Sequence, residues 1–153
     1  MTLRQGRLAV IAATLATALL PLVSARAAQN GQSAEVFKAR LSPVPINVAM
    51  MSTIAGTGSL TATLQGKQLT IQGTFEGLRS PATTAQIHRG PKGIRGPAIP
   101  NLELKATNAA KGTISGTIEL TPDQIADLRA GRFYVQVQSE RAPDGNLWGW
   151  LLK

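Results

Sequence analysis

The strongest constraint on the fold of this chain is an alternation of apolar and polar residues with a period of two. In residues 57–64 the even positions are small or apolar, whereas the odd positions carry threonine or serine. A similar alternation occurs in residues 69–76, 113–120 and 133–138. Because successive side chains of a β-strand point to opposite faces, each segment is predicted to be a strand with one face in solvent.

Turn-forming residues separate these segments. Residues 65–68 (Gln-Gly-Lys-Gln) are predicted to join the first two as a hairpin. A short first strand is predicted at 36–41, before a Ser-Pro-Val-Pro sequence. Residues 143–145 (Pro-Asp-Gly) are predicted to form a turn before a last strand at 147–152. Seven or eight such strands predict an all-β fold, an antiparallel sandwich or barrel.

One short helix is predicted near residues 122–130. Thr121 can act as the N-cap, Pro122 suits the first helical position, and Gln124 can complete a capping box. The helix is expected to close one end of the strands. Its two apolar residues at helical spacing are expected to face the core: Ile125 and Leu128.

The first 27 residues have the three parts of a Sec-type signal peptide. Arg4 and Arg7 precede an apolar run over residues 8–23, and residues 25–27 (Ala-Arg-Ala) offer small residues for cleavage after Ala27. The run is shorter than the ~20 residues of a membrane-spanning helix, so we predict cleavage and no membrane span in the mature chain. The expected location is periplasmic or secreted.

The remaining chain is predicted to be a flexible polar lead over residues 28–34 and one β domain over residues 35–153. Removal of the signal peptide takes away three arginines and no acid, which lowers the net charge from +8 to +5. A basic surface favours anionic partners. Nucleic acid is not an expected partner of an exported chain, and the sequence predicts no particular oligomeric state.

The composition argues against an enzyme. The chain has no cysteine and a single histidine, His88, which excludes disulfides, thiol nucleophiles and cysteine-bound metals. The sequence contains no Gly-x-Ser-x-Gly motif, and its acidic residues are scattered rather than paired. We therefore predict no catalytic residue, no metal site and no cofactor.

Six segments resemble, in order and spacing, parts of a CHRD domain. They lie at residues 69–78, 80–90, 93–97, 112–117, 128–137 and 143–149. The resemblance covers about residues 36–152 and implies an immunoglobulin-like β-barrel, as expected for chordin and for many exported bacterial proteins. It implies no enzymatic activity, and a resemblance of fold does not define a ligand.

The chain departs from the family pattern at three positions. Gln86 and Gln138 stand where members commonly carry histidine, and Asn146 stands where they often carry glutamate. If those family side chains converge on a metal, this chain has kept only His88. A lone imidazole makes a poor metal site, because three or four suitable donors are needed.

Six residues form a candidate face for a ligand or partner. Residues two apart on a strand share a face, which groups them into three pairs: Gln86 with His88, Gln136 with Gln138, and Trp148 with Trp150. If their strands are neighbours, amides, one imidazole and two indoles form a surface for a protein or glycan. The alternative makes His88 a solvent-side residue bonded to a neighbour, and places at least one indole in the core.

The loop at residues 89–97 is a second candidate site. It contains Arg89, Lys92 and Arg95 without an acid, and its glycines and prolines disfavour regular structure. Exposed amides and three cations could hold a sulfate, phosphate or uronate group. The alternative is a solvated connector whose charges aid solubility.

These features together predict an exported, non-enzymatic binding module for a protein or anionic glycan partner in the cell envelope. Two alternatives stay open. One is a structural envelope component without a discrete ligand, and the other is a periplasmic metal-binding protein that uses His88.

Overall fold

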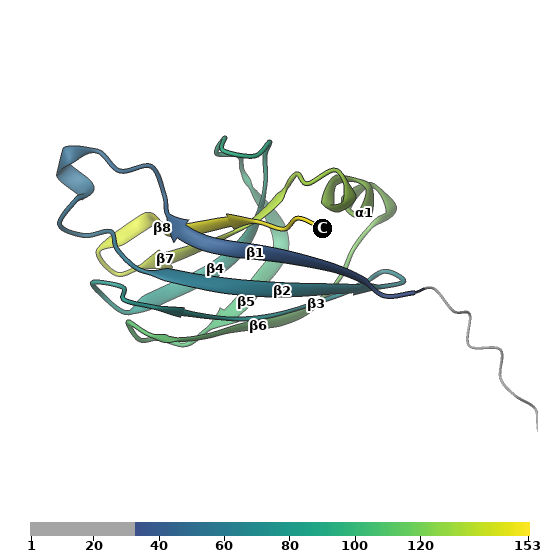
Figure 1. Cartoon of the computed structure of the whole chain (residues 1–153), viewed down its shortest axis with the longest axis horizontal. Coiled ribbons are helices and arrows are strands. Elements are labelled where there is room, and N and C mark those ends of the chain that lie inside the picture. The colour runs from purple at the N-terminus through teal and green to yellow at the C-terminus, as the bar shows by residue number, and fades with distance from the viewer. Residues whose placement is uncertain (1–32) are drawn as a thin grey trace, which may run out of the picture. The chain divides into compact units, whose positions relative to one another are not determined.

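The computed structural model describes residues 33–153, which form eight antiparallel strands and one α-helix (Figure 1). The strands close into a barrel in the order β1-β2-β3-β6-β5-β4-β7-β8. Their bounds are β1 Glu35–Pro43, β2 Thr57–Gln65, β3 Gln68–Glu76, β4 Ala82–Arg89, β5 Ala98–Ala106, β6 Gly112–Glu119, β7 Phe133–Ser139 and β8 Ala142–Trp150. The all-β antiparallel prediction is confirmed, and the closed barrel is the form adopted.

Alternating side chains of the strands fill the barrel, as the period of two predicts. In β2 the apolar residues Leu60, Ala62 and Leu64 are buried, while the threonines between them face outward. Leu60 lies opposite Gly73 of β3, where a Cβ atom would come within 2.2 Å of the Ser59 carbonyl oxygen. Glycine therefore lets these two strands approach closely.

The helix α1 (Pro122–Arg129) closes one end of the barrel on the connection from β6 to β7 (Figure 1). Its capping box is present: the Gln124 amide donates to Thr121 Oγ1 at 3.3 Å, and the Thr121 amide donates to the Gln124 side chain at 2.9 Å. Ile125 and Leu128 are buried in the main core. The helix prediction is confirmed.

Two strand predictions need correction. The turn between β7 and β8 is at residues 140–141, whereas the predicted turn residues 143–145 lie within β8. Ser139 pairs with Ala142 and Val137 with Leu147, so a bulge of β8 lies opposite Gln138. Gly145, at φ 126°, serves this bulge rather than a turn.

The strand β5 was not predicted. Apolar residues alternate with charged ones only in its second half, from Leu102 to Lys105. Its first half contains Pro100 and Asn101, and Asn101 has a left-handed φ of 62°. These two residues weaken the pattern that identifies the other strands.

An ion-pair cluster joins the beginning and the end of the described chain. Glu35 at the start of β1 pairs with Arg129 of α1 at 2.5 Å and with Lys153 at 2.6 Å. Hydrogen bonds from Arg129, and then from Lys153, lower the pKa of the Glu35 carboxyl from 4.5 to about 2. The cluster therefore ties α1 and the C-terminus to the first strand.

The predicted signal peptide at 1–27 and most of the predicted lead at 28–34 lie outside the described residues. Within residues 33–153, no helix has the length and apolar character needed to cross a membrane.

Candidate binding groove

The face predicted from the sequence lies on the outside of β4, β7 and β8, which are neighbours in the barrel. The strand register forms two rows of three residues: Gln86, Gln136 and Trp148 in one, and His88, Tyr134 and Trp150 in the other. Five of the six predicted residues thus come together. Gln138 lies next to them on β7, opposite Thr84.

This face is not the open polar patch that the alternation suggested. His88, Gln136 and Trp150 are 8%, 4% and 8% exposed. The Gln136 side chain donates to the Asp144 carbonyl oxygen at 3.2 Å. The alternative for His88 is wrong about its exposure, because the loop at residues 89–97 lies over the ring, but the hydrogen bond to a neighbour that it includes is present, with the Gly96 carbonyl oxygen. Gln86 and Gln138 are half-buried.

The loop at residues 89–97 is bonded to the aromatic side chains beneath it. Trp150 Nε1 donates to the Gly90 carbonyl oxygen at 3.0 Å. The Tyr134 hydroxyl donates to the Gly96 carbonyl oxygen and accepts from the Gly96 amide, both at 3.0 Å. Backbone amides of the loop that we expected in solvent, those of Arg89, Gly90 and Gly96 among them, have partners within the domain.

His88 lies in the centre of this arrangement. Its Nδ1 atom is 3.1 Å from the Gly96 carbonyl oxygen, which can only accept, so Nδ1 carries the proton. The Nε2 atom is buried with no hydrogen-bond partner among the described residues. The ring stacks on Tyr134 with centroids 5.1 Å apart. No cluster of three or more His, Cys, Asp or Glu side chains that could hold a metal ion occurs in residues 33–153.

The three cations of the loop do not converge on one anion site. Arg89 forms an ion pair with Asp127 of α1 at 2.8 Å. Arg95 donates to the Asp144 carbonyl oxygen at 3.1 Å. Lys92 is exposed and forms no ion pair with any described residue. Asp127 and Asp144 are distant in sequence, so the loop composition gave no sign of these contacts.

Lys92 instead belongs to a groove of about 280 Å³ on the outer surface of β1 and β8. The groove is lined by three cations, two indoles and small or apolar residues: Lys38, Arg40, Lys92, Trp148, Trp150, Ser42, Gly149 and Leu152. None of these residues is acidic. We call this site the basic groove. It combines the predicted indoles with one cation of the predicted loop.

Lys38 and Arg40 were missed in the sequence analysis. Alternation along β1 does place them outward, because the residues that alternate with them, Phe37, Ala39 and Leu41, are buried. The missing information was that β1 pairs with β8, where Ser42 lies opposite Trp148. Gly149 permits this close pairing, since a Cβ atom there would lie 2.6 Å from the Arg40 carbonyl oxygen.

The two indoles that line the basic groove, Trp148 and Trp150, pack against other buried side chains. The rings of Trp148 and Trp150 meet edge to face at 4.7 Å between centroids, and Trp150 also lies 4.6 Å from Tyr134. Trp148 is half-buried against a small apolar cluster of Val44, Ile54 and Ala142. The indoles are therefore fixed, while the exposed lysine and arginine side chains remain free to adapt to a ligand.

Comparison with known families supports the resemblance seen in the sequence. The model of the CHRD domain matches residues 37–151. The chain belongs to the CHRD domain family. Comparison with curated proteins and with solved structures finds no significant match.

At Asn146, one of the positions where we predicted a departure from the family pattern, the side chain has a structural role. Asn146 is fully buried, donates to Ser139 Oγ at 2.9 Å and accepts from the Ala55 amide at 3.2 Å. Gln86, at another, forms a long hydrogen bond of 3.4 Å with Glu103 of β5. Asn146 thus holds the loop at residues 44–56 against β8.

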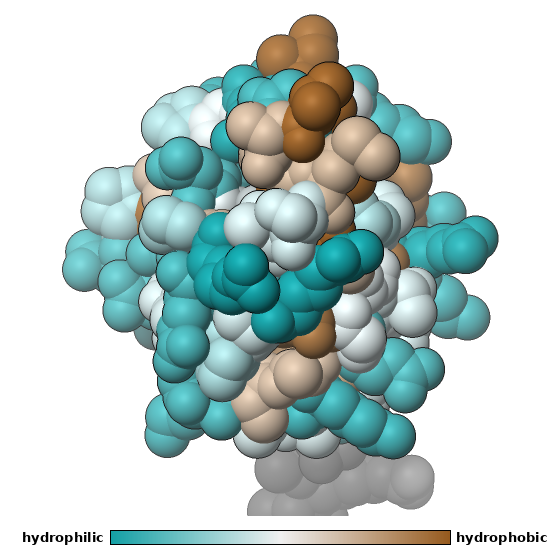
Figure 2. All heavy atoms as spheres, turned by 90° about the vertical axis from the view of Figure 1, so that its left-hand side faces the viewer, coloured by the Kyte–Doolittle hydropathy of each residue, from teal (hydrophilic) through white to brown (hydrophobic). Residues whose placement is uncertain are grey.

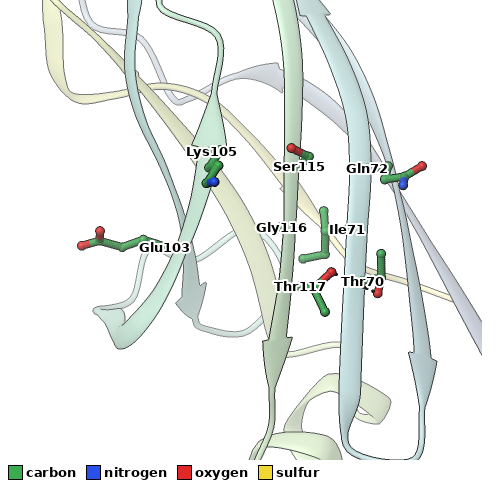
Figure 3. Close-up of a pocket in the computed structure, with 8 residues that line it drawn as sticks. All are labelled: Thr70, Ile71, Gln72, Glu103, Lys105, Ser115, Gly116 and Thr117. Carbon is green, nitrogen blue, oxygen red and sulfur yellow. Dashed lines mark hydrogen bonds between the residues drawn. The ribbon is translucent and has the colours of Figure 1, made fainter.

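A second hollow of this CHRD domain, of about 400 Å³, lies over β3, β5 and β6 (Figure 3). Its side chains include threonines, Gln72, Ser115 and the oppositely charged Glu103 and Lys105. It forms where β5 and β6 pair through only two residue pairs. This hollow has no aromatic wall and no excess of one charge, so the basic groove is the better candidate for a binding site.

Proposed function

We propose that this CHRD domain is an exported, non-enzymatic binding module that holds an anionic glycan in the basic groove. The observation that carries the proposal is the combination of Lys38, Arg40 and Lys92 with two fixed indoles and no acidic side chain. Cations recognise the carboxylate or sulfate groups of such a glycan. The half-buried Trp148 offers apolar surface to a sugar ring, and the buried Trp150, whose Nε1 is bonded to the Gly90 carbonyl oxygen, supports it.

The size of the groove supports a short saccharide rather than a protein surface. Its volume of about 280 Å³ is close to the lower end of small-ligand sites, roughly 300 to 1,000 Å³. The fixed aromatic wall reduces the entropy lost when a ligand is bound. Export through the signal peptide predicted at residues 1–27 would bring the groove to the anionic polymers of a cell envelope.

Tryptophan fluorescence provides a direct test, because the two tryptophans of the chain are both in the groove. Titration with tetragalacturonate, an acidic tetrasaccharide, is expected to change the emission in a saturable way, and titration with neutral maltotetraose is not. The double variant Lys38→Ala/Arg40→Ala should bind at least tenfold more weakly, since hydrogen bonds to charged groups contribute about 1.5 to 3 kcal/mol each.

Lys67→Ala is the matched control, because Lys67 is an exposed cation in the turn between β2 and β3. It should bind tetragalacturonate as the parent does. The single variant Lys38→Ala should bind more weakly than Lys67→Ala, and equal weakening in these two variants would indicate a general charge effect and contradict a specific groove. Absence of any saturable response to tetragalacturonate or to sulfated oligosaccharides would also reject the proposal.

A further inference from the structure

A cluster of exposed apolar side chains lies away from the basic groove. Five large apolar residues of the described chain are exposed, and three of these belong to the loop at residues 44–56: Ile46 at 46%, Val48 at 86% and Met51 at 62%. We call these three residues the apolar tip. Figure 2 views the molecule from the left-hand side of Figure 1, and hydrophobic side chains project at its top.

The sequence around the apolar tip is uncharged, and the tip stands out from the barrel. No Asp, Glu, Lys or Arg occurs between Arg40 and Lys67. The tip surrounds the 3-10 turn η1 (Val48–Met50), which Asn47 caps by accepting from the Met50 amide at 3.1 Å. In Figure 1 this turn projects beyond the ends of the neighbouring strands.

The base of the loop is fixed, so the tip is held in this position. Val44 and Ile54 are buried with Ala142, and the Val44 amide donates to the Asn146 carbonyl oxygen at 3.0 Å. The Ala55 amide donates to the Asn146 side chain. Because the base is packed and bonded, the exposed apolar side chains are a built feature of the surface rather than a consequence of a loose loop.

We propose that the apolar tip inserts into the interfacial layer of a lipid bilayer, a function beyond the glycan binding proposed above. A convex, uncharged tip fits a fluid layer that can close around it, whereas a protein partner would need a matching pocket. Arg79 and Arg141 are next in sequence to two residues at the base of the loop: Leu78, which adjoins Gly56, and Ala142, which belongs to one apolar cluster with Val44. Their positive charge would favour anionic headgroups. Glu140 offsets part of this charge, so apolar insertion provides the main contribution.

The absence of cysteine from the chain permits a position-specific test. Single variants Val48→Cys and Met51→Cys, in the full chain, are labelled with an environment-sensitive nitrobenzoxadiazole dye and mixed with phosphatidylethanolamine–phosphatidylglycerol vesicles (3:1). The dye emission is expected to shift to shorter wavelength, and nitroxide-labelled lipids should quench it. Each dye reports only on the surroundings of the residue to which it is attached. Vesicle binding through an apolar N-terminal segment would therefore not shift the emission at positions 48 and 51.

Val36→Cys and Ile94→Cys are the matched controls, because these apolar residues are similarly exposed, at 46% and 59%, but lie elsewhere. Their dyes should keep the emission of the free protein. Adding Val48→Asp to the Met51→Cys chain should weaken the vesicle response at least tenfold, and Lys38→Ala/Arg40→Ala should leave it unchanged. The variant Lys38→Ala/Arg40→Ala should therefore lose glycan binding while it keeps the vesicle response, which distinguishes the two proposals.

Three results would overturn the proposal. The first is no shift at positions 48 and 51 with vesicles. The second is an equal shift at positions 36 and 94, which would indicate general adsorption. The third is a shift that follows protein concentration without vesicles, which would make the apolar tip a contact between copies of this chain.

Discussion

Two loops lie next to β8 on the outside of the barrel, and they differ in what holds them. The loop at residues 89–97 is rich in glycine, proline and cations, and side-chain hydrogen bonds from Trp150 and Tyr134 hold Gly90 and Gly96 near its two ends, while residues 91–95 between them are exposed. The loop at residues 44–56 is uncharged, and an apolar cluster with bonds to Asn146 holds its base, while its tip is in solvent. Loop polarity therefore did not decide which part of each loop is held. The decisive factor was the set of partners that neighbouring strands supply to the loop.

The largest expected effect concerns the support of the loop at residues 89–97. Tyr134→Ala removes a fully buried ring and both hydrogen bonds to Gly96, so the free energy of unfolding should fall by about 3 to 5 kcal/mol. Urea unfolding measures this change. Tyr134→Phe, which loses only the hydroxyl, should cost about 1 kcal/mol. A loss below about 1 kcal/mol for Tyr134→Ala would mean that the loop does not depend on this ring.

A close contact within the loop at residues 89–97 gives the next effect. A Cβ atom at Gly96 would lie 1.8 Å from the Arg89 carbonyl oxygen, so Gly96→Ala must displace the loop, at about 1 to 3 kcal/mol. Displacement should also change the emission of Trp150, which is bonded to Gly90. At Gly93, a new Cβ meets no atom within 4 Å, although φ is 84° and alanine would strain its own backbone. The emission should therefore change less in Gly93→Ala than in Gly96→Ala. Equal emission changes in both variants would contradict the proposed packing.

The support of the apolar loop is tested at Asn146. Asn146→Ala leaves the Ala55 amide without its partner and should cost about 1 to 3 kcal/mol. Hydrogen exchange at the Ala55 amide is expected to accelerate. Asn47→Ala, which removes only the cap of η1 near the tip, should leave exchange at Ala55 as it was. Slow exchange at Ala55 in Asn146→Ala would show that the small apolar cluster holds the loop by itself.

A pH titration tests the ion-pair cluster of Glu35, Arg129 and Lys153, which lies outside both loops. The folded-state pKa of Glu35 is lowered to about 2 from 4.5, so its ionised form stabilises the fold above about pH 4.5. This contribution is lost as the pH falls toward 2, because the unfolded state takes up the proton first. Thermal unfolding should show parent and Glu35→Gln converging over that range. A constant difference between them would refute the assignment.

The smallest effect is expected at the apolar tip. Val48 is 86% exposed, so Val48→Ser should change the free energy of unfolding by no more than about 0.5 kcal/mol. Urea unfolding of this variant beside Tyr134→Ala compares the two loops directly. A loss above about 1 kcal/mol would show that the tip packs against the domain in solution.

The local pattern of the sequence predicts those strands and helices in which neighbouring residues alone produce the pattern. Alternation predicts β2 and β3 because one face of each is buried, and Thr121 with Gln124 predicts α1 because a capping box is a local hydrogen-bond pattern. The pattern fails for β5, where Pro100 and Asn101 interrupt it. It also fails at residues 143–145, because a positive φ at Gly145 suits a bulge as well as a turn.

In the candidate site, too, the local pattern predicted some features and missed others. The sequence alone determined that Gln86 and His88, Gln136 and Gln138, and Trp148 and Trp150 share faces, since a strand has a period of two. The tertiary structure alone decided that the loop at residues 89–97 buries His88 and that Asp127 forms an ion pair with Arg89. It also decided that β1 brings Lys38 and Arg40 next to the indoles. Those contacts depend on barrel closure between β1 and β8, which joins segments about a hundred residues apart, beyond the reach of any local pattern.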